Sequence, residues 1–123
     1  MKYAILCYSD ESLVTGLSKA QDAAMMETIG ATSAELQQER KLGAAVRLMP
    51  TSAALTVRHG GGEPAVLDGP FAETKEQLLG LYLVECESLD DAIDAARRLA
   101  KGRTPGSLEI RPVRSLRDYG PLA

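Results

Sequence analysis

A chain of 123 residues is the size of one domain, and its 45% hydrophobic and 25% charged residues are typical of a globular protein rather than a disordered chain. The net charge of −3, with no basic run longer than Arg97 and Arg98, argues against direct nucleic-acid binding and against an anionic membrane as a partner. No apolar stretch reaches membrane-spanning length, and Asp10 and Glu11 directly follow the first apolar run, which is unlike a signal peptide. We therefore expect a cytoplasmic protein.

The first third of the chain predicts a strand followed by a long helix. Residues 2–9 form a short, nearly continuous apolar run, as expected of a central strand covered on both faces, and a polar connection follows to residue 17. Ser18 with Gln21 three positions later is a capping box, and the helix is predicted to run to about residue 42, where Gly43 ends it. The apolar face of this helix carries Met25, Ile29 and Leu36.

The middle of the chain predicts a short strand and then a hairpin. Residues 44–49 form the strand, and residues 55–58 and 65–68 form the two arms of the hairpin. Residues 60–62 between the arms are three glycines. A phosphate-binding loop would lead into the N-terminus of a helix, whereas this one leads into a strand, so the glycines indicate a flexible hairpin tip.

The last third predicts a strand, a helix and a closing strand. Residues 81–86 form the first of these strands, and Ser88 with Asp91 three positions later caps a helix over residues 89–101. Residues 107–113 form the closing strand. The predicted apolar stripe of the helix is Leu89, Ala92, Ile93, Ala96 and Ala100, and its solvent face carries Asp90, Asp94, Arg97 and Lys101.

This order of elements predicts an α+β fold of the ferredoxin-like type, β-α-β-β-α-β with an inserted hairpin. Both long helices would cover one face of an antiparallel sheet. The strands are apolar on both faces, and the chain has no further helix to cover the second one. We therefore expect a second copy of the chain to cover it, in a homodimer.

The segment that connects the hairpin to the next strand combines a rigid turn with an aromatic side chain and several charges. Gly69 frees the backbone and Pro70 restricts it, so that the direction of Phe71 is set by the turn. We expect Phe71 to be buried as an anchor. Asp68 is expected to accept hydrogen bonds from the backbone N–H groups of the turn, and Thr74 is expected to begin a single helical turn.

Cysteine and histidine chemistry is sparse. Cys7 and Cys86 both lie in predicted strands without metal-ligand spacing, which favours buried, reduced thiols over a disulfide. His59, the one histidine, stands beside the glycine tip, where an exposed loop residue is expected rather than a catalytic base. We expect no metal site and no cofactor.

Five segments carry a family resemblance through nearly the whole chain: MKYAILCY (1–8), DGPFAETKEQ (68–77), GLYLV (80–84), LDDA (89–92) and LEIRPV (108–113). In these segments the chain resembles the DGPF branch of the YCII-related family. The resemblance implies a dimeric ferredoxin-like α+β barrel, with one domain over residues 1–113 and a tail over residues 114–123, and it implies no particular reaction. The His–Asp pair of broader YCII-related proteins does not transfer, because this chain has no histidine early in its sequence.

The polar residues in and around the segment at residues 68–76 predict a candidate pocket. A carboxylate such as Asp68 or Glu73 would do acid–base chemistry if partial burial raised its pKa, and Tyr82 and Arg111 would orient a small polar or anionic ligand. In the structural alternative, Asp68 caps the turn, Phe71 fills the core or the dimer interface, and the charged residues are solvated or pair across that interface. The candidate pocket residues are Asp68, Phe71, Glu73, Lys75, Tyr8, Tyr82 and Arg111.

Three functions remain open at this stage. The first is a small dimeric binding or interaction module with a pocket beside the turn at residues 68–71. The second is a cofactor-independent enzyme acting on a small organic substrate, by analogy of fold alone. The third is a regulatory protein associated with sigma-factor-type transcription proteins, a role that the low positive charge would confine to protein contacts.

Overall fold

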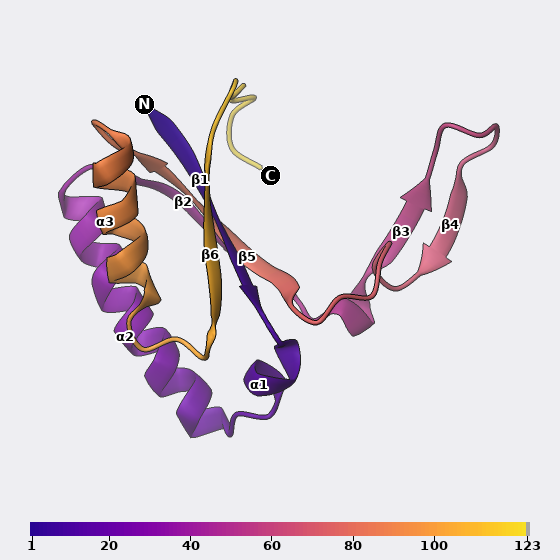
Figure 1. Cartoon of the computed structure of the whole chain (residues 1–123), viewed down its shortest axis with the longest axis horizontal. Helices are drawn as coiled ribbons and strands as arrows, with labels where there is room; N and C mark the ends of the chain where they lie inside the picture. The colour runs from indigo at the N-terminus through magenta and orange to yellow at the C-terminus, as the bar shows by residue number, and fades with distance from the viewer. Residues whose placement is uncertain (123) are drawn as a thin grey trace.

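The computed structural model describes residues 1–122, which form a four-stranded antiparallel sheet with helices on one face and a separate hairpin (Figure 1). The sheet has the strand order β2-β5-β1-β6, so the two strands farthest apart in sequence, β1 and β6, are neighbours. This order and the antiparallel pairing are compatible with a ferredoxin-like α+β fold. The strands of the sheet are β1 (Lys2–Ser9), β2 (Leu42–Arg47), β5 (Gln77–Glu85) and β6 (Gly106–Pro112).

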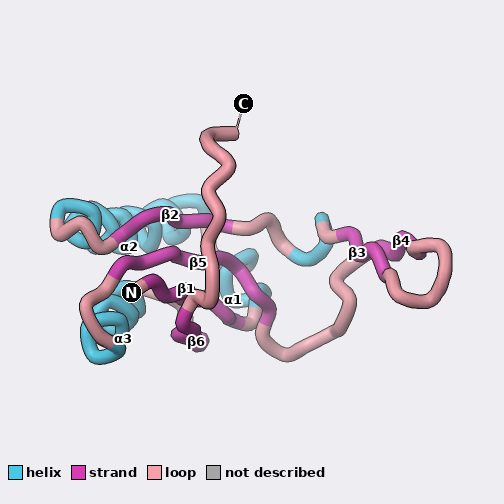
Figure 2. The backbone as a smooth tube through the Cα atoms, turned by 90° about the horizontal axis from the view of Figure 1, so that it is seen from above, coloured by secondary structure: helices cyan, strands magenta, loops and turns pink. Residues whose placement is uncertain are grey.

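Two long helices, α2 (Lys19–Gln38) and α3 (Leu89–Ala100), cover the same face of the sheet (Figures 1 and 2). The predicted capping box of α2 is confirmed, because the Ser18 side chain accepts a hydrogen bond from the Gln21 backbone while the Gln21 side chain accepts one from the Ser18 backbone. The predicted cap of α3 is confirmed as well, since the Asp91 backbone N–H donates to Ser88 Oγ over 3.1 Å.

The end of α2 was predicted too late. The helix stops at Gln38 rather than near residue 42, because Arg40 adopts a left-handed conformation with a φ of 60° and the chain then turns into β2. Leu42 already pairs with Val84 of β5. Gly43 therefore lies at an irregularity of the strand and does not end a helix.

The apolar stripe of α3 is rotated from the prediction. Leu89 is 53% exposed and Ala100 is also exposed, so the two ends of the predicted stripe lie in solvent. The buried face instead consists of Ala92, Ala95, Ala96 and Leu99. Three small side chains on this face let the helix approach the sheet closely.

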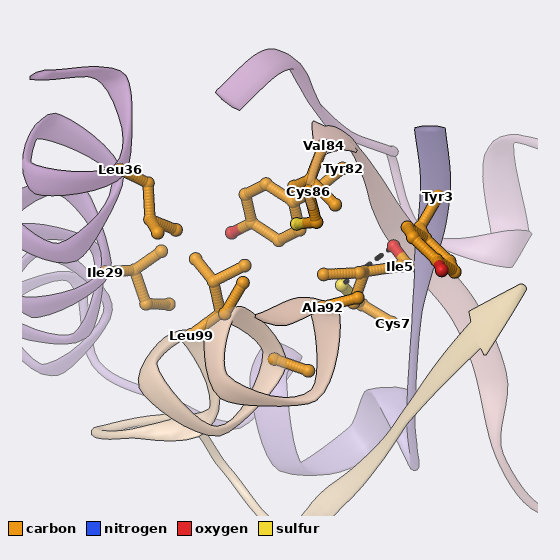
Figure 3. Packing of buried hydrophobic residues seen from close by; sticks show 12 residues of the cluster. Tyr3, Ile5, Cys7, Ile29, Leu36, Tyr82, Val84, Cys86, Ala92 and Leu99 are labelled. Carbon is orange, nitrogen blue, oxygen red and sulfur yellow. Dashed lines mark hydrogen bonds between the residues drawn. The ribbon is translucent and has the colours of Figure 1, made fainter. Parts of the chain in front are cut away.

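The hydrophobic core lies between the helices and the sheet (Figure 3). Alternate residues of β1 point into it, and Ile5 at its centre has no exposed surface. Cys7 and Cys86 are both buried and free, as the sequence predicts. The four largest fully buried side chains are Ile5, Leu36, Val84 and Leu99.

A short helix that the sequence prediction missed follows β1. The segment expected to be a polar connection contains α1 (Glu11–Thr15), whose N-terminus is capped by Asp10 through a hydrogen bond of 3.0 Å from the Ser12 backbone. Aspartate directly before the first helical residue is a recognisable start signal. The helix was missed because a single turn carries no measurable hydrophobic period.

The predicted hairpin projects from the body of the molecule as an arm on the side of the sheet away from α2 and α3 (Figures 1 and 2). It consists of β3 (Leu55–Arg58) and β4 (Ala65–Asp68), preceded by a 3-10 turn, η1 (Thr51–Ala53). His59 is exposed at its tip. Five apolar side chains of this arm and the segment after it are 45–78% exposed, namely Leu55, Val57, Val66, Leu67 and Phe71.

The remaining segments are irregular. The tail expected over residues 114–123 contains no helix or strand as far as residue 122, and residue 123 lies outside the described residues. Within residues 1–122, none of the helices combines the length and the apolar character that crossing a bilayer requires.

Candidate binding cavity

A cavity of about 490 Å³ lies between the sheet and the N-terminal half of α2. Helix α1 and the connection from α3 to β6 close its sides. The fully packed core described above lies farther along α2, around Leu36, so the cavity occupies the end of the helix–sheet layer that side chains leave unfilled. Its volume is in the range of known sites for small molecules.

Most of the cavity wall is apolar. Met25, Met26 and Ile29 contribute from successive turns of α2, and Val14 contributes from α1. Methionine is flexible and polarizable, so two adjacent methionines give this wall a surface that adapts to the shape of a bound molecule. Leu48 and Met49, which follow β2, are 44% and 76% exposed and also border the cavity.

One end of the cavity is polar, and Arg103 is its central residue. The Arg103 Nε donates to the backbone oxygen of Leu99 over 2.6 Å, which ties the side chain to the C-terminal end of α3, where a positive charge is favourable. The guanidinium Nη2 donates to the Tyr82 hydroxyl. The guanidinium carbon also lies 5.3 Å from the centre of the Tyr82 ring, which is cation–π geometry.

Two further hydroxyl groups border this polar end. Ser9 at the end of β1 donates to the backbone oxygen of Pro105 over 2.7 Å, and its Oγ lies 3.5 Å from the Thr104 hydroxyl. Ser9 is buried. These bonds hold the connection between α3 and β6 against the end of β1, and they place Thr104 beside Arg103 in the cavity wall.

The remaining charged residues of the wall have partners that fix them in place. The Glu11 carboxylate accepts hydrogen bonds from the Thr51 backbone and hydroxyl, and the Glu11 backbone N–H donates to the Gln77 side chain over 2.9 Å. Arg47 forms an ion pair of 2.6 Å with Asp22 of α2. Both residues therefore connect the elements around the cavity.

Two titratable side chains of the cavity, Tyr82 and Cys7, stay neutral beside the positive charge of Arg103. Burial raises the pKa of the Tyr82 hydroxyl, and the nearby positive charge of Arg103 opposes that shift. Burial likewise raises the pKa of the Cys7 thiol, again against the influence of Arg103. Both groups are therefore protonated at neutral pH, so Cys7 is no activated nucleophile and Tyr82 retains a proton that it can donate.

Comparison with known proteins places the chain in a family. The model of the YCII-related domain matches residues 1–117, nearly the whole chain. The chain belongs to the YCII-related family. It is also 51% identical over 114 residues to an uncharacterized protein of Rhizobium meliloti (strain 1021), and the match covers 92% of each chain.

The YCII-related domain brings only two of the predicted site residues to the cavity. Tyr8 and Tyr82 line it, whereas Asp68, Phe71, Glu73 and Lys75 lie on the exposed segment at the base of the arm. Arg111 occupies the opposite face of the sheet, because it alternates with Ile110, and it forms an ion pair with Glu109.

Two predictions about the turn at residues 68–71 are wrong for the single chain. Phe71 is 78% exposed rather than buried. The turn is held by backbone and threonine groups instead of Asp68: the Gly69 N–H donates to the Ala54 oxygen over 2.8 Å, and the Thr56 hydroxyl donates to the Gly69 oxygen over 2.8 Å. Within residues 1–122, the Asp68 side chain is exposed and makes no hydrogen bond.

The expected helical turn at Thr74 is also absent. The Thr74 hydroxyl donates to the Glu76 oxygen, and the Gln77 side chain donates to the Thr74 oxygen, both over 2.5 Å. These local bonds form a compact bend that leads directly into β5 at Gln77. Gln77 is thereby positioned to hold Glu11 at the cavity wall.

Sequence reasoning did not identify Arg103, the central residue of the polar end. The signal was its position after a helix C-terminus, where an arginine is ordinary and suggests no function. Its partner Tyr82 is 21 residues earlier in the chain, on another element, so the pair is produced only by the folded arrangement.

Proposed function

We propose that this YCII-related domain is a binding module that holds one small organic molecule in the cavity beneath α2. The cavity itself carries the proposal: about 490 Å³ of space with an apolar wall on one side and a small group of polar side chains at one end. This is the arrangement of known small-molecule sites, in which apolar surface supplies affinity and a few polar groups orient the ligand.

The experiment is a thermal-shift screen of small organic molecules against the wild-type protein and a variant with a filled cavity. Met26→Trp places a large side chain in the cavity wall, and Glu27→Trp at the exposed neighbouring position is the matched control. A ligand at 100 times its dissociation constant stabilises the folded state by about 2.7 kcal/mol. We expect ligands that stabilise the wild type and Glu27→Trp but leave Met26→Trp unchanged, and equal stabilisation of all three proteins would contradict the proposal.

A cofactor-independent enzyme is the second candidate, and Tyr82 is the observation that favours it. The hydroxyl of Tyr82 accepts a hydrogen bond from Arg103 and keeps its own proton, so it can donate a hydrogen bond to negative charge that develops on a bound substrate. Turnover separates the two functions. If the protein is an enzyme, mass spectrometry will show conversion of a bound molecule, and Tyr82→Phe will stop conversion while binding persists.

We further propose that two copies of the chain associate through the open face of the sheet. Leu6, Leu81 and Leu83 are half-buried side by side on this face, and Val46 at its edge is 45% exposed. The β6 edge of this face carries the ion pair of Glu109 and Arg111. No helix of the described residues covers this face of the sheet (Figure 2). An apolar sheet face of this kind is expected to pair with a second copy, as in a dimeric α+β barrel.

In this proposal the arm and the segment at residues 68–76 belong to the dimer interface. The arm projects on the same side as the open face, so a partner that covers the face also meets the arm (Figure 1). A two-stranded hairpin is marginally stable alone, and the exposed apolar side chains of β3 and β4 lack a covering surface within residues 1–122. Phe71 would then be buried against the partner, and the charged residues Glu73 and Lys75 would lie at the rim.

A further inference from the structure

Arg103 is a cation without an acidic partner in the described part of the chain. It takes part in none of the ion pairs found among residues 1–122. A guanidinium group has five N–H donors, and the protein uses two of them, one on Leu99 and one on Tyr82. The remaining donors have no acceptor within residues 1–122.

The acidic residues near the cavity are already engaged elsewhere. Glu11 is the one acidic residue of the cavity wall, and both of its carboxylate oxygens accept hydrogen bonds from Thr51. Asp22 is paired with Arg47. The cavity therefore combines a half-buried positive charge, which has no acidic partner within residues 1–122, with a mainly apolar wall. An organic anion from outside would find both a charge and an apolar surface there.

The groups around Arg103 complete a site for a planar anion. Tyr82 accepts a hydrogen bond from the guanidinium and keeps its own proton, which is not donated to any acceptor in residues 1–122. The Thr104 hydroxyl has one hydrogen-bonding neighbour there, Ser9 Oγ, which lies 3.5 Å away and donates its own proton to Pro105, so Thr104 is the donor in this long contact. Arginine binds a carboxylate through two parallel N–H groups, and a phenol and a hydroxyl beside it supply additional donors.

Resting on the binding function proposed above, we propose that the ligand is a small organic monocarboxylate with an apolar body. Its carboxylate binds Arg103, Tyr82 and Thr104 at the polar end, and its body lies against Met25, Met26 and Ile29. A phosphate ester fits less well, because it carries up to two charges and the second arginine of the wall, Arg47, is paired with Asp22.

The test compares carboxylic acids with their primary amides, which have the same shape and no charge. Benzoate and benzamide, phenylacetate and phenylacetamide, and hexanoate and hexanamide are titrated into the full chain, with binding followed by ligand-observed NMR. We expect the wild-type protein to prefer each acid over its amide by about tenfold or more, since hydrogen bonds between charged groups are stronger than neutral ones.

Variants then assign the preference to Arg103. Arg103→Met removes the charge and should reduce the ratio to about twofold or less, as expected when the charge-assisted bonds are lost. Arg97→Met removes the same charge from the solvent face of α3 and should leave the ratio unchanged. Arg103→Lys retains a cation and should retain a preference for the acid at lower affinity, so it reports on the charge if Arg103→Met fails to fold.

The outcomes separate this inference from the binding function. Acids and amides that bind the wild type equally well, with loss of both in Met26→Trp, would overturn the carboxylate assignment and leave the binding module intact. An acid preference that persists in folded Arg103→Met would also overturn it. If no molecule of either class binds and the thermal-shift screen finds no ligand, both proposals fail together.

Discussion

Both faces of the central sheet carry apolar side chains, although β6 adds the ion pair of Glu109 and Arg111 to the open face, and the helices cover only one of the two faces. Along β1, Tyr3, Ile5 and Cys7 point to the helices and are buried, whereas Ala4 and Leu6, which alternate with them, point away and are half-buried. The covered face includes a cavity at one end, and the open face lies beside an arm of exposed apolar side chains. The proposals above assign a small ligand to the covered face and a second copy of the chain to the open face.

The covered face should respond to truncation in the single chain, and this is the largest effect that we expect. Leu99 has no exposed surface and packs at the centre of the core, so Leu99→Ala should lower the free energy of unfolding by about 2–5 kcal/mol. Leu89 on the same helix is 53% exposed, and Leu89→Ala should cost less than about 1 kcal/mol. Urea denaturation of both variants measures the difference, and similar losses would contradict the burial of Leu99 and the exposure of Leu89.

A substitution on the open face should weaken the dimer and leave the fold of the single chain unchanged. Leu81→Lys places a charge at the centre of the proposed interface, where its cross-strand neighbours Leu6 and Val46 are apolar and burial without a partner is costly, and should weaken the dimer on the order of 100-fold. Light scattering coupled to gel filtration measures the change, and circular dichroism should show an unchanged fold. A wild-type chain that is monomeric at micromolar concentration would contradict the proposed dimer through the open face.

Phe71 distinguishes the arm from the body. Because its ring is 78% exposed, Phe71→Ala should leave the stability of a dilute monomer within about 0.5 kcal/mol of the wild type. If the arm packs against a partner, the same change should weaken the dimer by about tenfold, since aromatic side chains dominate many interfaces. Concentration-dependent unfolding reports both quantities. A large loss in the monomer would show instead that the ring is buried within its own chain.

The features that were predicted correctly from the sequence depend on residues that are close together in the chain. The bounds of the hairpin, 55–58 and 65–68, match the structure because strand alternation and a glycine tip are local signals. The caps at Ser18 and Ser88 depend on residues three positions away and are likewise correct. The order of the elements along the chain was also predicted, apart from α1 and η1.

The features that were missed depend on residues far apart in the chain. The turn at Gly69 is held by Ala54 and Thr56, which are more than ten positions earlier in the chain. The prediction assigned the hydrogen bonds of the turn to the neighbouring Asp68 instead. The cavity results from packing that leaves one end of the helix–sheet layer unfilled, and no local sequence pattern predicts where such a cavity forms. The pairing of Arg103 with Tyr82 likewise exists only once α3 lies across β5.

The smallest expected effect concerns what holds the arm itself. Thr56→Val keeps the shape of the side chain and removes the hydrogen bond to the Gly69 oxygen, which should cost about 1 kcal/mol. Amide hydrogen exchange at Gly69, whose N–H is bonded to Ala54, should then accelerate by about fivefold. Asp68→Ala removes a carboxylate that makes no hydrogen bond within residues 1–122, so it should leave the exchange rate nearly unchanged. If Asp68→Ala accelerates exchange at Gly69 more than Thr56→Val does, Asp68 is the hydrogen-bond acceptor of the turn after all. If neither substitution changes the exchange rate, contacts with the partner subunit hold the arm in place.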